Sequence, residues 1–248
     1  MILVGTVGYQ PTKRQGTRKK TDVREVASMA HHARRFGTVE VEWDCFPPGG
    51  GGGLVPESFR WVLRLPRSLT HGRELSPALA FDLASLAETG RLACLLAPFP
   101  LDFSNRPENQ RFLQRLQSWA GELPLAVQFL NKEWIVEGME AWLRTIGLCY
   151  CAVDLPRLPG LTQPVAWVTG PVAMVRLCGR DAAYWQTNPD RGPDQEYVYD
   201  LLELAEWLPK IEEMSALAPL TLVIANGSRS AQMLSDLLDV PTRPEAGR

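Results

Sequence analysis

The sequence lacks the motifs that would identify several common protein classes at once. No two cysteines have the CxxC spacing of a structural zinc site, and no apolar run reaches the about 20 residues that a membrane span needs. The five consecutive glycines at 49–53 have neither the GxGxxG spacing nor a following helix. There is also no GxSxG nucleophile elbow and no HExxH pair. These absences argue against NAD, ATP, zinc-protease and serine-hydrolase chemistry.

The composition shows no excess of charge of one sign. Lysine and arginine number 26 against 28 acidic residues, so the net charge of −2 gives no global field that would favour nucleic acid or a membrane surface. The apolar segment 1–10 lacks the basic region and cleavage site of a signal peptide, so we expect a cytoplasmic protein without a membrane partner. The five cysteines are odd in number and all fall in predicted strands, which favours buried, reduced thiols.

The sequence does contain a series of short strands, each of which ends in polar residues. Strands are predicted at about 2–8, 38–45, 92–98, 125–130, 148–154, 173–178 and 220–226, and a further strand is predicted to begin near residue 59. Helices are predicted at about 22–36, 77–89, 107–120, 133–146, 197–214 and 230–238. This alternation predicts an α/β fold, a TIM-type barrel of eight strands over residues 1–241, with a flexible tail at 242–248. The connections after strands two and six are rich in glycine or proline, so both crossovers are predicted to be abbreviated.

The second predicted strand carries three acidic residues at alternate positions. Alternation places Glu40, Glu42 and Asp44 on one face, which we expect to face the barrel interior. Carboxylates in a low-dielectric interior need cationic partners, and Arg64 and Arg176 are the predicted ones. The residues alone leave open whether this network is structural or functional.

Seven short segments, in order along the chain, resemble the YecE-like family, which is catalogued as domain of unknown function 72. They are GTVGY at 5–9, FGTVEVE at 36–42, RLPRSLTH at 64–71, AVQFLNKEW at 126–134, VDLPRLP at 153–159, MVRLCGR at 174–180 and ANG at 225–227. The resemblance implies a TIM-barrel-like fold and no established activity. The chain departs from the family pattern at Gln128, where a glutamate is usual, and at Cys178 and Asn131, where histidines are usual. These departures favour a divergent member that binds without catalysing.

Polar residues at the carboxyl ends of barrel strands are the candidate site residues, because active sites of such barrels lie at that face. Asp44 and Asp154 are the candidate bases or metal ligands, His71 is the candidate proton carrier, and Arg67 and Arg180 are expected to clamp phosphate. The candidate ligand-binding residues are Tyr9, Arg64, Arg67, Asn131, Trp134, Arg157, Arg176, Arg180 and Asn226.

Three further features bear on ligand binding. Trp134 and Trp185 are candidate stacking surfaces, and Tyr184 and Trp185 together are a candidate pocket wall. The segment 11–24 carries six basic residues against Asp22 alone, which would attract phosphates.

The leading hypothesis is a barrel whose C-terminal mouth binds a phosphate-bearing ligand or nucleic acid, with phosphodiester or acid–base chemistry if it is catalytic. A non-catalytic binding or scaffold barrel is the second hypothesis, and a metal-dependent sugar isomerase or lyase is the third. No cofactor is required by the sequence. A single strand-end histidine among scattered carboxylates is a poor zinc signature and leaves Mg²⁺ or Mn²⁺ as the metals to consider. The oligomeric state is not predicted.

Overall fold

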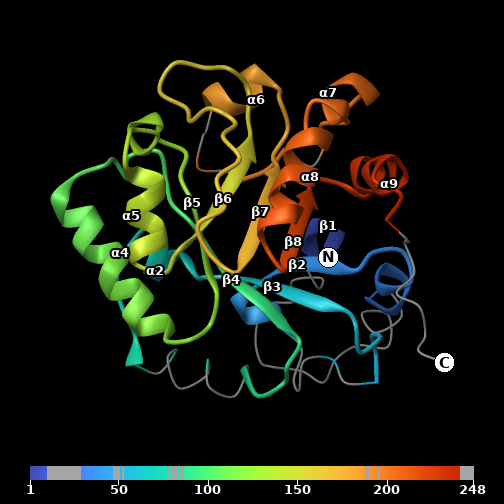
Figure 1. Ribbon diagram of the computed structural model, residues 1–248, viewed down its shortest axis with the longest axis horizontal. Coiled ribbons are helices and arrows are strands. Elements are labelled where there is room, and N and C mark those ends of the chain that lie inside the picture. The colour runs from blue at the N-terminus through green and yellow to red at the C-terminus, as the bar shows by residue number, and fades with distance from the viewer. Residues whose placement is uncertain are drawn as a thin grey trace.

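Eight parallel strands follow one another in chain order and close into a barrel in the computed structural model (Figure 1). The model describes residues 1–9, 29–46, 51, 53–77, 79, 83, 87–187, 190, 192–194 and 196–240, without the side chain of Tyr9. The strands are β1 (Ile2–Tyr9), β2 (Thr38–Glu42), β3 (Arg60–Arg64), β4 (Leu92–Pro98), β5 (Leu125–Gln128), β6 (Cys149–Asp154), β7 (Val172–Leu177) and β8 (Leu220–Ala225). Pairing of β1 with β8 closes the ring, so the predicted TIM-type architecture is confirmed.

Helices surround the barrel, with α4 and α5 on one side and α8 and α9 on the other (Figure 1). The α-helices are α2 (Arg67–Thr70), α4 (Pro107–Ala120), α5 (Met139–Thr145), α6 (Ala182–Thr187), α7 (Leu201–Ala205), α8 (Leu208–Leu217) and α9 (Ser228–Leu237). Short 3₁₀ turns are η1 (Trp43–Cys45) and η3 (Lys132–Trp134). Residues 29–33 are also helical, at the end of the predicted helix 22–36, and residues 77, 79, 83 and 87 are helical within the predicted 77–89.

Two predicted helices are wrong as single elements. The predicted helix 133–146 is the turn η3 followed by α5, because Gly138 at the start of α5 has a φ of 80° that interrupts the helix. The predicted helix 197–214 is divided into α7 and α8. A capping box between Asp200 and Glu203 starts α7, and Pro209 lies in the first turn of α8. The short helices α2 and α6 were not predicted.

The second strand is shorter than the sequence pattern indicates. It ends at Glu42, and the chain then turns through η1, so Asp44 is exposed and does not continue the inward alternation of Glu40. Cys45 lies in the same turn and Cys178 follows β7, so the prediction that all cysteines lie in strands is wrong for these two.

The two crossovers that were predicted to be abbreviated agree with the part of the chain that the structure describes. Residues 155–171, which follow β6, form no helix, and the described residues between β2 and β3 form no α-helix. Within the described part of the chain, no helix has the length and apolarity to span a membrane. The predicted tail at 242–248 lies outside the described residues.

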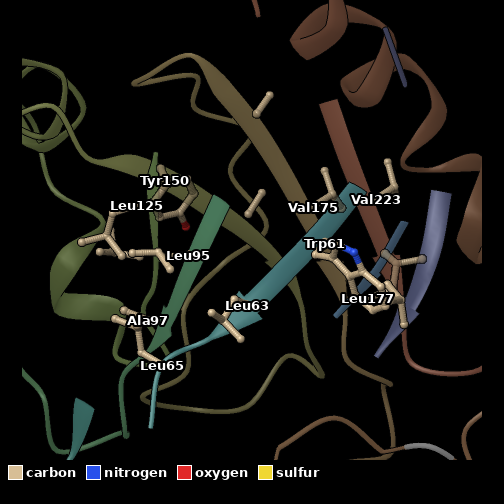
Figure 2. Close-up of a cluster of buried hydrophobic side chains, with 14 of the residues drawn as sticks. Trp61, Leu63, Leu65, Leu95, Ala97, Leu125, Tyr150, Val175, Leu177 and Val223 are labelled. Carbon is tan, nitrogen blue, oxygen red and sulfur yellow. The ribbon is translucent and has the colours of Figure 1, made fainter. Parts of the chain in front are cut away.

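The apolar core has an outer and an inner layer. The outer layer packs between strands and helices, and Figure 2 shows part of it, including Trp61, Leu95 and Val223. The inner layer fills the lumen and includes four buried thiols, those of Cys94, Cys149, Cys151 and Cys178. Burial raises the pKa of Cys149 to about 11 and that of Cys178 to about 12, so these thiols stay protonated and unreactive at neutral pH.

Candidate ligand-binding site at the barrel mouth

A buried ion pair lies in the lumen near the carboxyl ends of the strands. Arg176 of β7 donates from Nε to Glu40 Oε2 at 2.8 Å and from Nη2 to Glu40 Oε1 at 2.6 Å. Its Nη1 donates to Gln128 Oε1 of β5, also at 2.8 Å. All three side chains are buried. Burial disfavours the charged form of Arg176, but the adjacent Glu40 carboxylate outweighs this and raises its pKa, so the guanidinium stays charged.

A second arginine extends this network toward the rim of the barrel. Residues Glu42 and Arg64 pair in register across β2 and β3, and Arg64 hydrogen-bonds Glu42. Its Nη1 also lies 3.7 Å from Glu40 Oε1. The predicted pairing of Arg64 and Arg176 with the strand-two carboxylates is therefore confirmed. Two arginines balance two glutamates in this network, and Gln128 adds no charge.

A small cavity of about 90 Å³, here called the basic cleft, opens above this network. Its polar lining consists of Arg64, Arg67, Thr70, His71, Gln128, Arg176 and Asp190. Within the described part of the chain, the guanidinium of Arg67 makes one long hydrogen bond, from Nη1 to the backbone oxygen of Asp190 at 3.4 Å, and its side chain is exposed. Cations therefore exceed carboxylates in the described lining of the basic cleft.

His71 supplies a neutral imidazole to the basic cleft. Its Nδ1 lies 2.9 Å from Thr70 Oγ1, while Nε2 is buried without a hydrogen-bond partner in the described part of the chain. Burial lowers the pKa of His71 below its ordinary 6.5, and the nearby Arg67 lowers it further. Asp190 and Asp102 oppose this shift more weakly. The ring is thus uncharged at pH 7 and has one buried nitrogen without a hydrogen-bond partner among the described residues.

A larger cavity of about 900 Å³, here called the acidic cavity, lies beside the basic cleft and shares Arg64 with it. The ionisable side chains in its described lining are Glu40, Glu42, Arg64, Asp181, Asp194 and Glu196, and Tyr184, Thr187 and Tyr197 add hydroxyl groups. The carboxylates come from β2 and from the long connection after β7, in which α6 lies at the top of Figure 1. The acidic cavity therefore has an excess of carboxylates, whereas the adjacent basic cleft is lined mainly by arginines, two of them paired with Glu40 and Glu42.

The structure brings only some of the predicted site residues together. Arg64, Arg67, His71 and Arg176 meet in the basic cleft, as expected from their strand-end positions. Asp44 lines neither cavity. The side chain of Tyr9 and the basic segment 11–24 lie outside the described residues. The aromatic pair Tyr184 and Trp185 does contribute to pocket walls, one residue to each cavity.

Asp154 and Arg180 form a separate cluster outside the lumen. Arg180 donates two hydrogen bonds to Asp154, at 2.8 and 2.9 Å, and a third to Glu206 at 2.9 Å. Asp154 also accepts from Trp207 Nε1 at 3.0 Å, and Trp207 belongs to the outer core layer. The expected phosphate clamp of Arg67 with Arg180 is therefore wrong, because Arg180 is held by carboxylates and lines neither cavity. The exposed Arg157 lines neither cavity either.

Three other predicted ligand-binding residues make structural contacts. Trp134 is buried and stacks on Phe129 with ring centroids 4.2 Å apart, so the expectation that it stacks on a ligand is wrong. Asn131 uses both ends of its amide on backbone groups, donating to Leu101 and accepting from the N–H of Glu133. Asn226 donates to the carbonyls of Asp194 and Tyr197, which positions a wall of the acidic cavity.

Several residues of the acidic cavity were missed by sequence reasoning. Asp181, Asp194 and Glu196 lie in a connection that no recognisable motif marks. The sequence feature that could have indicated them is the number of acidic residues in the connection that follows the predicted strand 173–178. Among the described residues, no group of three His, Cys, Asp or Glu side chains is placed to hold a metal ion. The described part of the site thus gives no support to the metal-dependent alternative.

Comparisons with known proteins agree on one family. The family model described as "Protein of unknown function DUF72" matches residues 53–243. The UPF0759 protein YunF of Bacillus subtilis (strain 168) is 24% identical over 213 residues, covering 75% of each chain. A solved DUF72 family protein from Enterococcus faecalis V583 has a TM-score of 0.79 at 22% identity, covering 97% of this chain and 98% of that one. Another, from Thermotoga maritima MSB8, has a TM-score of 0.79 at 23% identity, covering 96% and 99%. At these identities the solved structures support the barrel fold alone.

Proposed function

Because this chain belongs to the DUF72 family, described only as proteins of unknown function, we propose a function from its own geometry: binding of a phosphate-bearing ligand in the basic cleft. The observation that carries the proposal is the convergence of Arg64, Arg67, Arg176 and the neutral His71 on one cavity at the barrel mouth. The C-terminal mouth is where barrels of this type bind their ligands.

Arg67 is the main phosphate contact in this proposal. Arg176 donates hydrogen bonds to Glu40 and Gln128, and Arg64 donates one to Glu42. Among the described residues, Arg67 makes only its long bond to a backbone carbonyl, so in this part of the chain its planar fork is available for two phosphate oxygens. The Nε2 atom of His71 adds a further hydrogen-bonding position. Arg64 and Arg176, which are paired with Glu42 and Glu40, then form the charge-balanced floor beneath the phosphate.

The geometry favours binding over catalysis. The carboxylates expected to act as bases, Asp44 and Asp154, do not line the basic cleft. Gln128, which lines it, cannot exchange a proton. Phosphodiester or acid–base chemistry would therefore depend on His71 and Asp190 among the described lining residues. A binding protein needs no such pair, so the non-catalytic reading is the one we adopt.

The size of the basic cleft favours a small ligand over a nucleic-acid strand. A cavity of about 90 Å³ accepts one phosphate group rather than a run of them. Isothermal titration with inorganic phosphate, and separately with DNA and RNA oligonucleotides across a salt series, distinguishes the two. Nucleic-acid binding would weaken steeply with salt. Oligonucleotide binding without phosphate binding would contradict the small-ligand proposal.

The test variant is Arg67→Gln, with Arg111→Gln as the matched control. Arg111 is exposed on α4 and lines neither cavity. Loss of one charge-assisted hydrogen-bonding group should weaken phosphate binding by about tenfold or more. The control should bind like the wild type, and thermal melts should show both variants folded. Unchanged binding in Arg67→Gln, or an equal loss in the control, would refute the proposal.

A further inference from the structure

We infer that the acidic cavity binds a cationic, amine-bearing part of the same ligand, so that the mouth recognises a phosphate ester that also carries an amine. This inference rests on the proposed phosphate site and specifies the class of ligand that the site takes. It starts from the excess of carboxylates in the acidic cavity, which shares Arg64 with the basic cleft.

The described lining of the acidic cavity has a clear excess of negative charge. Five carboxylates face one guanidinium, that of Arg64. Counting Arg176, which pairs with Glu40 below the cavity, still leaves three carboxylates in excess. Glu40 and Asp194 are buried, where water screens charge least. A cationic group entering the cavity would relieve this excess.

The hydroxyl groups of the cavity are already committed as hydrogen-bond donors. Tyr184 donates to the carbonyl of Gly192 at 3.1 Å, and Thr187 donates to that of Ala183 at 2.6 Å. The Tyr197 hydroxyl donates to the Glu203 carboxylate. The lining therefore offers mostly acceptors to a ligand. An ammonium group has three donors, no acceptor and a positive charge, which is the matching chemistry.

The two cavities are placed so that one ligand can reach both. Glu40 lines the acidic cavity, Arg176 lines the basic cleft, and their ion pair forms a common floor. The basic cleft holds little beyond a phosphate group. The acidic cavity, at about 900 Å³, has the size of a small-molecule site and accepts the rest of the ligand.

The test compares two probes that differ in one group, glucosamine 6-phosphate and glucose 6-phosphate. Both are titrated at pH 7 into the full chain by calorimetry, alongside inorganic phosphate. The aminated probe should bind about tenfold more tightly than the hydroxylated one, because its protonated amine meets the carboxylates. Phosphate alone should bind more weakly than the aminated probe.

The charge of the cavity is then reduced without changing its shape, in the double variant Asp181→Asn, Glu196→Gln. Asp181 Oδ1 accepts from the N–H groups of Ala183 and Tyr184, and an asparagine oxygen keeps both bonds. Glu196 is exposed. The matched control, Glu212→Gln with Glu213→Gln, removes the same charge from an exposed part of α8.

The double variant should lose the tenfold preference for the amine and keep its affinity for inorganic phosphate, while the control keeps both. If wild-type protein binds phosphate but does not prefer the aminated probe, this inference is overturned and the phosphate proposal stands. A preference that survives in the double variant also overturns it. If neither phosphate nor either sugar phosphate binds, the proposed function fails and this inference fails with it.

Discussion

The two halves of the barrel mouth share a floor and an arginine but differ in the charged side chains that line them. The basic cleft takes its arginines from β3, the start of α2 and β7, whereas the acidic cavity takes carboxylates from β2 and from the connection after β7. The strands between them contribute a charge-balanced network of Glu40, Glu42, Arg64 and Arg176. The barrel therefore supplies a neutral polar floor, and the segments after the strands determine which ligand groups each half accepts.

The largest expected effect comes from breaking the shared floor with Glu40→Gln. This change leaves Arg176 charged and buried without its carboxylate, which should cost about 3–5 kcal/mol in the free energy of unfolding. Glu42→Gln is the matched control, because Glu42 is two residues away on the same strand face and its side chain is 36% exposed. It should cost less than about 1 kcal/mol.

Urea denaturation of both variants measures this difference. Equal stabilities of Glu40→Gln and Glu42→Gln would show that the floor does not depend on the buried pair. Addition of Arg176→Met to Glu40→Gln should recover part of the lost stability, since the unpaired charge is then removed.

An intermediate effect is expected from Gln128→Glu, which makes the basic cleft resemble its acidic neighbour. The side chain keeps its shape and its acceptor for Arg176 Nη1 but gains a negative charge in a buried position. Repulsion should weaken binding of inorganic phosphate by at least about tenfold. Gln114→Glu, an equivalent change at an exposed position of α4, should have no effect. Unchanged or tighter phosphate binding by Gln128→Glu would contradict the assignment of anion binding to this half.

The smallest expected effect is a pH dependence of anion binding that only the basic cleft should show. The pKa of His71 is lowered from 6.5 in the free protein, and a bound anion should raise it, so binding takes up a proton. Sulfate affinity should therefore rise by about threefold as the pH falls from about 7.5 to about 5. Sulfate remains a dianion over this range, which removes the titration of the ligand itself. His71→Asn should abolish the dependence, and a flat wild-type profile would exclude His71 from the site.

The fold was predictable because its signals are local and repeated. The predicted strand 92–98 and helix 107–120 coincide with β4 and α4, since a buried apolar run and a helix-starting Pro107 determine their limits. The predicted helices 133–146 and 197–214 are each divided in the structure, at breaks whose effect depends on tertiary contacts. Gly138 adopts a φ of 80° between α5 and the turn η3, which the buried Trp134 holds against the core.

The floor of the site was predictable, but its periphery was not. Strand alternation correctly placed Glu40 in the lumen and paired it with Arg176. The same rule, applied to β6, would have excluded Asp154 from the barrel interior. Val153 belongs to the inner layer, so its neighbour faces outward, where Arg180 and Trp207 hold it. The acidic connection after β7 could not be placed from the sequence, because nothing in its pattern shows how it folds back over the mouth.

The most direct test of the account is the position of a bound anion in crystals of the full chain soaked with tungstate, located by its anomalous scattering. We expect a peak in the basic cleft, within hydrogen-bonding distance of the Arg67 guanidinium and His71 Nε2, and no peak in the acidic cavity. A peak in the acidic cavity, or one confined to arginines outside the mouth, would contradict the assignment of opposite ligand groups to the two halves.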